Sequence, residues 1–181
     1  MHQKLAYRQL ARADIAHLVQ INRTEVIDGF YTWHDGALVL QNELFHIPDW
    51  STAEKQRRIQ KLQTVFDNGA TFFGAFCATS LVGLSVLDHC PIKTGENRLN
   101  LEGLWVSHSF RGQGVGQKLF RLAAESALER GASALYVSAT PSKHTVEFYT
   151  RLGCQPAQPI DPNLYQKEPE DIHLELLLLR P

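Results

Sequence analysis

Three glycines, Gly112, Gly114 and Gly116, stand at alternate positions directly after Arg111, between a predicted strand and a predicted helix. A glycine inside a helix costs about 1 kcal/mol relative to alanine, so three at a helix entrance indicate a backbone that turns tightly or approaches a ligand. A helix N-terminus carries unpaired N–H donors and about half a positive charge. The combination is typical of a site for an anion, most naturally a pyrophosphate.

The spacing of the glycines excludes the two commonest phosphate loops. A dinucleotide fingerprint, G-x-G-x-x-G, that begins at Gly112 needs a glycine at position 117, which is Gln117. A Walker A loop from the same start needs that glycine as well, and a serine or threonine at position 119, which is Leu119. The alternative that involves no ligand is a plain tight turn between strand and helix.

Two segments resemble motifs of one family. The run Arg111-Gly112-Gln113-Gly114-Val115-Gly116 matches the R/Q-x-x-G-x-G/A pattern of the Gcn5-related N-acetyltransferases, and the strand before it ends in Leu-Trp-Val. Downstream, SKHTVEFYTRLGC is similar to the family's N-x-x-A-x-x-F-Y-x-x-x-G-F helix, with Phe148, Tyr149 and Gly153 in register. The motifs occur in the family's order, and the resemblance covers residues 99–154.

The resemblance implies acetyl-CoA as the acetyl donor. In that family the pyrophosphate lies on backbone N–H groups of the loop, and the pantetheine arm pairs with the end of the preceding strand. A backbone N–H near Val106 would hold the thioester oxygen, and such a donor contributes about 100- to 1,000-fold in rate. Ser142 stands where the family usually has asparagine and can still donate one hydrogen bond. The implied cofactor-binding residues are Leu104, Trp105, Val106, Arg111, Gly112, Gln113, Gly114, Val115, Gly116, Gln117, Ser142 and Phe148.

Acetyl transfer to an amine needs a base, because an amine with a pKa near 10.4 costs about 4 to 5 kcal/mol to deprotonate at pH 7. Glu102 is the predicted base, directly or through water, since an extended strand places it on the same face as Leu104 and Val106. The family often has its glutamate two residues earlier, where this chain has Asn100. The alternative is that Glu102 is a half-exposed strand residue paired with an arginine.

The leaving thiolate needs a proton, and Tyr149 falls where the family has its tyrosine acid. The alternative is a tyrosine that only packs on a helix face. Cys154 follows the end of that helix and is expected to replace a core aromatic residue of the family, so no covalent cysteine intermediate is predicted.

The acceptor side is expected in the segment around the first two helices, as the resemblance implies. That segment holds carboxylates and aromatic rings, which would suit a cationic amine. The predicted acceptor-binding residues are Glu25, Tyr31 and Trp33, and the same segment contains Asp28, His34, Asp35 and Trp50. The alternative is an ordinary surface loop packed on a core. The histidines show no metal-ligand spacing, and we predict no metal site.

Periodicity predicts the elements that position these residues. Strands are expected near residues 4–10, 71–78, 81–89, 100–106, 134–139 and 171–180, and helices after Asp14 and over 51–69, 115–131 and 141–153. Ser51 and Glu54 have capping-box spacing. Residues 23–50 have no clean period and are expected to be irregular, with a short helix or a hairpin. The order predicts one α/β domain over residues 1–181, with a single mixed, mostly antiparallel central sheet flanked by helices, of the acyl-CoA N-acyltransferase type.

Composition indicates the cellular compartment and excludes some classes of partner. The 181 residues carry a formal net charge of -1 at pH 7, which gives no strong field for nucleic acid or an anionic membrane. The three cysteines are far apart and odd in number, so we expect neither a disulfide framework nor a zinc site, and a reduced, cytoplasmic setting. Without a leader or an apolar run long enough to span a bilayer, we expect neither export nor membrane insertion.

The leading prediction is an acetyl-CoA-dependent N-acetyltransferase that acts on a primary amine, of a small molecule or a protein, by direct attack in a ternary complex. A homodimer is compatible with the sequence. One alternative is a non-catalytic acyl-CoA-binding or sensing module that keeps the loop without turnover. Another is a nucleotide-binding kinase or phosphatase, which the failed Walker spacing disfavours.

Overall fold

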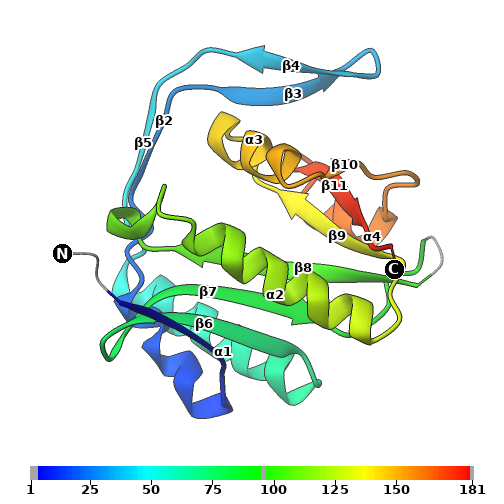
Figure 1. Ribbon diagram of the computed structural model, residues 1–181. Coiled ribbons are helices and arrows are strands. Elements are labelled where there is room, and N and C mark those ends of the chain that lie inside the picture. The colour runs from blue at the N-terminus through cyan, green and yellow to red at the C-terminus, as the bar shows by residue number, and fades with distance from the viewer. Residues whose placement is uncertain (1–3, 95–96, 180–181) are drawn as a thin grey trace. The chain divides into compact units, whose positions relative to one another are not determined.

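A computed structural model describes residues 4–94 and 97–179 and divides into two compact units (Figure 1). The first unit comprises residues 4–25, 48–89 and 101–126, and the second comprises residues 26–47, 90–94, 97–100 and 127–179. The class is mixed α/β and the strand pairs are mostly antiparallel, as the sequence predicts.

The first unit contains three strands, a fourth that it shares with the second unit, and four helical segments. They are β1 (Leu5–Gln9), η1 (Arg12–Gln20), α1 (Thr52–Asp67), β6 (Thr71–Cys77), β7 (Ser80–Asp88), β8 (Arg98–Val106), η2 (His108–Phe110) and α2 (Val115–Glu129). Its strands are hydrogen-bonded in the order β1-β6-β7-β8. The pairs β1–β6 and β6–β7 are antiparallel, which confirms the predicted hairpin.

Two apolar clusters cover the two faces of this sheet. One joins Ile15 and Leu18 of η1 and Ile59 and Leu62 of α1 to Phe72 of β6. The other joins Val115 and Leu119 of α2 to Ala75 and Val82, so α2 lies on the face opposite to α1 and η1 (Figure 1). The start of α2 is held close to the sheet by Gly83, where a Cβ atom would lie 2.9 Å from Leu119 Cδ1.

The first helix differs from its prediction. It is a 3-10 helix with Ala11 at its N-cap, and Asp14 lies in its first turn, where it accepts the Ala11 N–H at 2.8 Å and pairs with Arg8 at 2.7 Å. Val19 is 43% exposed, although the spacing of Ile15, Leu18, Val19 and Ile21 along an α-helix would place all four on its buried face. A 3-10 helix has three residues per turn, so the buried positions recur every third residue. Ile15, Leu18 and Ile21 are accordingly buried.

Helix α1 begins as predicted. Ser51 is its N-cap, and its hydroxyl oxygen accepts the Glu54 N–H at 3.3 Å. The Glu54 carboxylate in turn accepts the Ser51 N–H at 2.8 Å, which completes the capping box. The cap fixes the position of Trp50, which is buried one residue before it.

The second unit contains the remaining elements. They are β2 (Glu25–Ile27), which begins at the last residue of the first unit, β3 (Phe30–His34), β4 (Ala37–Gln41), β5 (Phe45–Ile47), β9 (Ala134–Ala139), α3 (Lys143–Arg151), β10 (Gln155–Pro156), α4 (Pro162–Lys167) and β11 (Ile172–Leu177). The first three residues of β8 pair with β9 in parallel, and β11 pairs with β9 and β10 antiparallel. The sequence did not predict β10 or α4.

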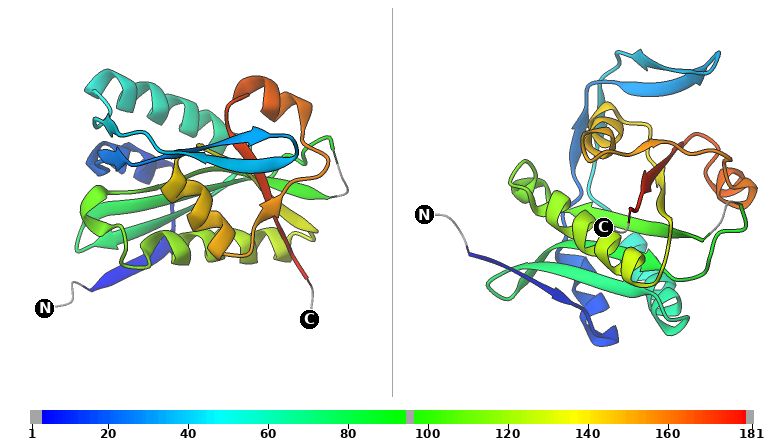
Figure 2. Two further views of the ribbon diagram at one scale, coloured as in Figure 1. Left: turned by 90° about the horizontal axis from the view of Figure 1, so that it is seen from above. Right: turned by 45° about the vertical axis from the view of Figure 1, so that its right-hand side comes forward.

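Residues 23–50 contain the predicted hairpin and no helix. Strands β3 and β4 pair antiparallel around Asp35 and Gly36, which both have positive φ, and β2 pairs with β5. Tyr31 N–H donates to Pro141 O at 2.7 Å and Lys143 N–H to Gly29 O at 2.8 Å, so the hairpin lies beside the start of α3 (Figure 2).

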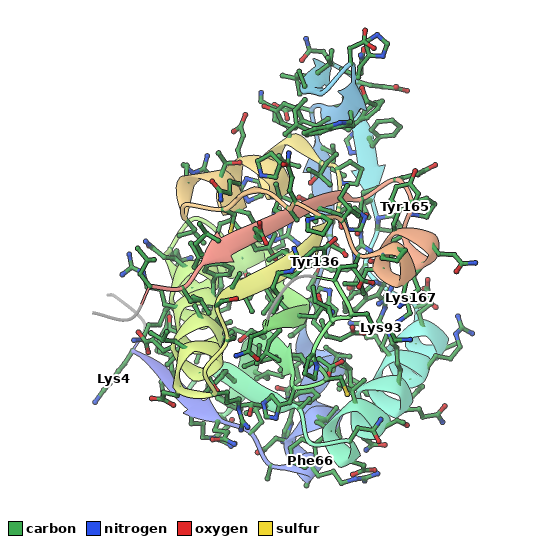
Figure 3. The ribbon with its side chains drawn as sticks, turned by 90° about the vertical axis from the view of Figure 1, so that its right-hand side faces the viewer. Lys4, Phe66, Lys93, Tyr136, Tyr165 and Lys167 are labelled. Carbon is green, nitrogen blue, oxygen red and sulfur yellow. The ribbon has the colours of Figure 1, made fainter. Side chains whose placement is uncertain are left out.

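A buried polar network holds β8, β9 and β11 together in the second unit. Arg98 and Glu175 form an ion pair at 3.0 Å, and both side chains are nearly inaccessible. The Tyr136 hydroxyl bonds to His173 Nδ1 at 2.9 Å and accepts the Asp161 N–H at 3.2 Å. Tyr136 of β9 and Tyr165 of α4 (Figure 3) both pack their rings on His173.

Within the described residues, no helix is both long and apolar enough to cross a membrane. The same part of the chain holds no group of three or more histidine, cysteine, aspartate or glutamate side chains that could bind a metal ion. None of Cys77, Cys90 and Cys154, which all lie within the described residues, forms a disulfide bond there.

Candidate active site

The three glycines differ in backbone conformation. Gly112 and Gly114 have φ values of +72° and +80°, whereas Gly116 lies inside α2. A Cβ atom added to Gly112 or Gly114 would meet nothing within 4 Å. The backbone conformation therefore requires glycine at two positions, and the space above both is open for a ligand.

Helix α2 presents its N-terminus at this turn. Its first helical hydrogen bond runs from Lys118 N–H to Gly114 O at 3.0 Å. The N–H groups of Val115, Gly116 and Gln117 precede that bond and have no helical carbonyl to accept them. These donors and the helix dipole suit an anion, so the chain fits the pyrophosphate of the cofactor that the sequence implies.

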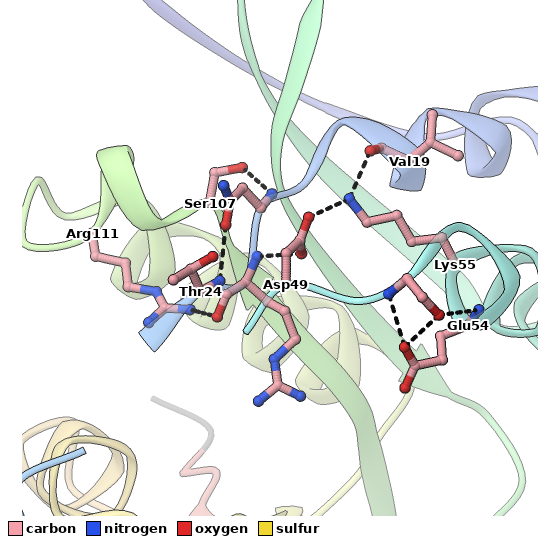
Figure 4. Close-up of polar contacts among 10 residues, drawn as sticks. Val19, Thr24, Asp49, Glu54, Lys55, Ser107 and Arg111 are labelled. Atoms are coloured by element: carbon pink, nitrogen blue, oxygen red, sulfur yellow. Dashed lines mark hydrogen bonds and ion pairs between the residues drawn. The ribbon is translucent and has the colours of Figure 1, made fainter. Parts of the chain in front are cut away.

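The Arg111 side chain ties this turn to the end of β8. Its Nε donates to Val106 O at 3.1 Å and its Nη2 to Arg23 O at 3.1 Å. Nη1 lies 3.5 Å from Glu25 Oε2. Arg111 therefore positions the turn, the last residue of the strand and residues 23–25 at once (Figure 4).

Residues 22–24 are held by further polar contacts (Figure 4). The buried Ser107 accepts the Asn22 N–H at its hydroxyl, 3.1 Å away, and His108 N–H donates to Asn22 O at 2.8 Å. Asp49 accepts the Arg23 N–H at 2.9 Å and the Lys55 ammonium at 2.7 Å. The sequence did not single out Asp49 and Lys55, because no local pattern predicts the contact between Asp49 and Arg23, which are 26 positions apart.

The end of β8 packs on both faces of the sheet. Leu104 and Val106 contact the cluster of Val115 and Leu119, below the start of α2. The Trp105 indole folds over Gly103, where a Cβ atom would lie 2.1 Å from the ring, and it meets Trp50 edge-on at 5.9 Å. The strand segment predicted to lie beside the thioester is thus packed against side chains on both faces of the sheet.

Glu102 is partly buried and engaged by a cation. Its Oε1 lies 2.7 Å from Lys61 Nζ of α1, and 17% of its side chain is exposed. The alternative to the predicted base role was a pairing with an arginine, and the cation found beside Glu102 is a lysine. Because 70% of the Lys61 side chain is exposed, the ion pair contributes little to stability and can open.

Tyr149 belongs to the second unit, on the buried side of α3. It is 6% exposed, and its ring meets Phe148 edge-on at 5.0 Å. Burial raises the pKa of the Tyr149 hydroxyl, and the nearby Cys154 and Asp171 raise it further. The phenol therefore stays protonated at neutral pH, which is the form that a general acid needs.

Ser142 caps α3. Its hydroxyl accepts the Thr145 N–H at 3.3 Å and donates to Thr145 Oγ1 at 2.8 Å, and its backbone bridges to Phe30. A serine at this position thus has a structural role of its own, beside the cofactor contact that the resemblance implies.

The predicted acceptor residues belong to both units, Glu25 to the first and Tyr31 and Trp33 to the second. Glu25 is paired with Arg111 in the first unit. In the second unit, the Tyr31 hydroxyl lies 3.5 Å from Glu147 Oε1, and Trp33 is 50% exposed on the hairpin. Tyr31 also lines an open cleft of about 380 Å³ together with Leu38, Val146, Glu147, Thr150 and Arg151. Three carboxylates of this segment have cationic partners: Glu25 with Arg111, Asp28 with Lys143 and Asp49 with Lys55.

A mixed sheet with an open glycine turn at a helix N-terminus is typical of proteins that bind a phosphate-bearing cofactor. The family model of the acetyltransferase (GNAT) family matches residues 29–154, and the chain belongs to that family. Thialysine N-epsilon-acetyltransferase of Bos taurus is 38% identical over 56 residues, which cover 30% of this chain and 33% of the relative. The chain thus spans about a third of the length of the curated relative it matches.

Solved structures share the fold along almost the whole chain. Nourseothricin acetyltransferase has a TM-score of 0.70 at 22% identity, with 97% of this chain and 99% of that chain covered. A chain from Bacillus anthracis, solved in complex with acetyl coenzyme A, has a TM-score of 0.65 at 15% identity, with 98% and 99% covered. At these identities the likeness concerns the fold.

Proposed function

We propose that this protein is an acetyl-CoA-dependent N-acetyltransferase that moves an acetyl group to a primary amine by direct attack in a ternary complex. The observation that supports it best is the turn at Gly112 and Gly114, which has open space at both glycines and stands directly before the N-terminus of α2. Membership of the acetyltransferase family supports the same donor. Three cysteines that form no disulfide within the described residues are consistent with a reducing, cytoplasmic setting.

The residues of the turn and of β8 would hold the donor. Backbone N–H groups between Arg111 and Gln117 would bind the pyrophosphate, and Leu104, Trp105 and Val106 would align the pantetheine arm. When bound, acetyl-CoA supplies a thioester whose acetyl carbon the amine attacks. A backbone N–H near Val106 would stabilise the negative charge on the acetyl oxygen.

Two side chains would move protons. Glu102, directly or through water, would take a proton from the amine nitrogen once the contact with Lys61 opens. Tyr149 would donate its phenolic proton to the departing sulfur, because burial keeps that phenol protonated. Burial raises the pKa of the Cys154 thiol to about 12, so this thiol is unreactive and a covalent cysteine intermediate is not part of the proposal.

A non-catalytic acyl-CoA-binding module is the second candidate. Two observations favour it: the Glu102 carboxylate is engaged by Lys61, and the Ser142 hydroxyl is used to cap α3. Such a module would bind the donor and release no thiol with any amine.

Thiol release from acetyl-CoA in the presence of polyamines, aminoglycosides, amino acids and peptides tests the proposal. We expect product with one of these classes, and calorimetry should show binding of CoA and none of ATP. Binding of CoA without product across the panel would support the non-catalytic module. Binding of ATP in preference to CoA would overturn both.

A further inference from the structure

Two arginines lie over one tryptophan close to the end of β8. The Cζ atoms of Arg58 and Arg23 are 4.3 Å and 5.5 Å from the Trp50 ring centroid. Trp50 is buried, and its other neighbour is Trp105, which it meets edge-on. Stacking on an aromatic face fixes a guanidinium group and leaves its N–H edge available for an anion.

The carboxylates of this region are engaged elsewhere. Asp49 pairs with Lys55 at 2.7 Å, Glu25 lies 3.5 Å from Arg111, and Glu102 lies 2.7 Å from Lys61. Among residues 4–94 and 97–179, no carboxylate forms an ion pair with the guanidinium of Arg23. Arg23 meets Asp49 and Arg111 through its backbone only. Its side chain therefore adds a positive charge that no carboxylate of the described residues neutralises.

A second observation concerns the tryptophan between the arginines. The indole Nε1–H of Trp50 is buried and donates to no acceptor within the described part of the chain. Native proteins satisfy almost all such donors, and an exception commonly marks a polar partner from outside the chain. An oxygen-bearing anion is the complement of both this donor and the arginine edge.

Arg23 and Trp50 lie close to the strand segment where the reaction is expected. Trp105 lies in the strand segment to which the resemblance assigns the thioester, and Trp50 separates it from Arg23. An acceptor whose amine reaches Leu104–Val106 would extend past Trp50 toward this arginine. A polyamine would bring a second cation there and be repelled, whereas a carboxylate would accept paired hydrogen bonds.

We infer that the acceptor carries a carboxylate in addition to its amine, as an amino acid does, and that Arg23 beside Trp50 binds this carboxylate. The inference rests on the proposed function, because it names the acceptor class of the same site. It adds a carboxylate to the cationic amine that the residue types of the segment 25–50 indicate.

Initial rates with saturating acetyl-CoA and two matched acceptor pairs test this inference. Cadaverine is L-lysine without its carboxylate, and putrescine is L-ornithine without it. We expect kcat/KM for the amino acid to exceed that for the diamine at least tenfold in one pair. Arg23→Met keeps the backbone contacts and the stem on Trp50, and should bring that ratio close to one. Arg57→Met, on the exposed side of α1, is the matched control and should leave the ratio unchanged.

Any other result contradicts either the carboxylate site or the proposed function. Equal or faster turnover of the diamines, or an unchanged ratio in Arg23→Met, would overturn the carboxylate site and leave the acetyltransferase proposal intact. No turnover of any of the four acceptors by a protein that binds acetyl-CoA would also overturn the carboxylate site. Failure to bind acetyl-CoA in calorimetry would overturn the proposed function itself.

Discussion

Arg111 Nε donates a hydrogen bond to the carbonyl oxygen of Val106 at 3.1 Å, so the residue that opens the glycine turn holds the residue that ends β8. The same guanidinium reaches Arg23 O at 3.1 Å. A single side chain thereby fixes the predicted pyrophosphate loop relative to the strand predicted to carry the thioester. Arg111 acts here as a positioning residue, through carbonyl groups of the chain.

Arg111→Met should weaken CoA binding at least tenfold in calorimetry, because both carbonyl contacts are lost. Hydrogen bonds that involve a charged group contribute about 1.5 to 3 kcal/mol, so urea unfolding should also show a loss of this order. Arg111→Lys should resemble the methionine variant, since one ammonium cannot reproduce the fork of donors. Arg121→Met, on an exposed position of α2, is the control. Wild-type CoA affinity in Arg111→Met would contradict the positioning role.

Elements with strong local signals could be predicted from the sequence. The capping box of Ser51 and Glu54, the apolar spacing of α2 and the β-rich runs of β6 and β7 each encode their structure within a few residues. The glycine turn belongs to this group, since a positive φ at Gly112 and Gly114 is a local requirement. Local chemistry thus accounts for the part of the site that would bind the cofactor.

Features that depend on distant contacts could not be predicted. The 3-10 form of η1 buries every third residue and leaves Val19 exposed, and propensity does not distinguish it from an α-helix. For residues 23–50 the sequence left a short helix or a hairpin open, because the strands that flank the Asp35-Gly36 pair are only five residues long. The ion pair of Glu102 with Lys61 joins a strand to a helix 41 positions away. The surroundings of the predicted base are therefore set by tertiary packing.

Replacing each glycine of the turn by alanine should have opposite effects on stability at the positive-φ positions and in the helix. Gly112→Ala and Gly114→Ala place a side chain at positive φ and should each cost about 1 kcal/mol in urea unfolding, with weaker CoA binding. Gly116→Ala lies in the helix and should gain about 1 kcal/mol of stability from helix propensity. Equal destabilisation by all three substitutions would contradict this distinction.

Tyr149→Phe should lower kcat at least tenfold and leave CoA affinity and stability nearly unchanged, because the ring remains packed against Phe148 while the proton is lost. Stopped-flow measurement of thiol release isolates the chemical step. The neighbouring Phe148→Leu is the control for packing, and it should affect stability more than the chemical rate. A Tyr149→Phe variant with the wild-type chemical rate would remove the acid role and leave only helix packing.

Asp171 should make the protein less stable as the pH rises toward 7. Burial and the neighbouring Glu168 raise the pKa of Asp171 from 3.8 to about 7 in the folded state. Between these values the unfolded chain releases the proton that the folded chain retains, so rising pH favours unfolding, and the full penalty is present above pH 7. Asp171→Asn stays neutral in both states. Its gain in unfolding free energy over wild type should therefore be absent near pH 3.5, grow up to about pH 7 and then level off. Urea titrations at several pH values measure this gain, with the exposed Glu129→Gln as the control. A gain that does not change with pH would show that the Asp171 proton is not linked to folding.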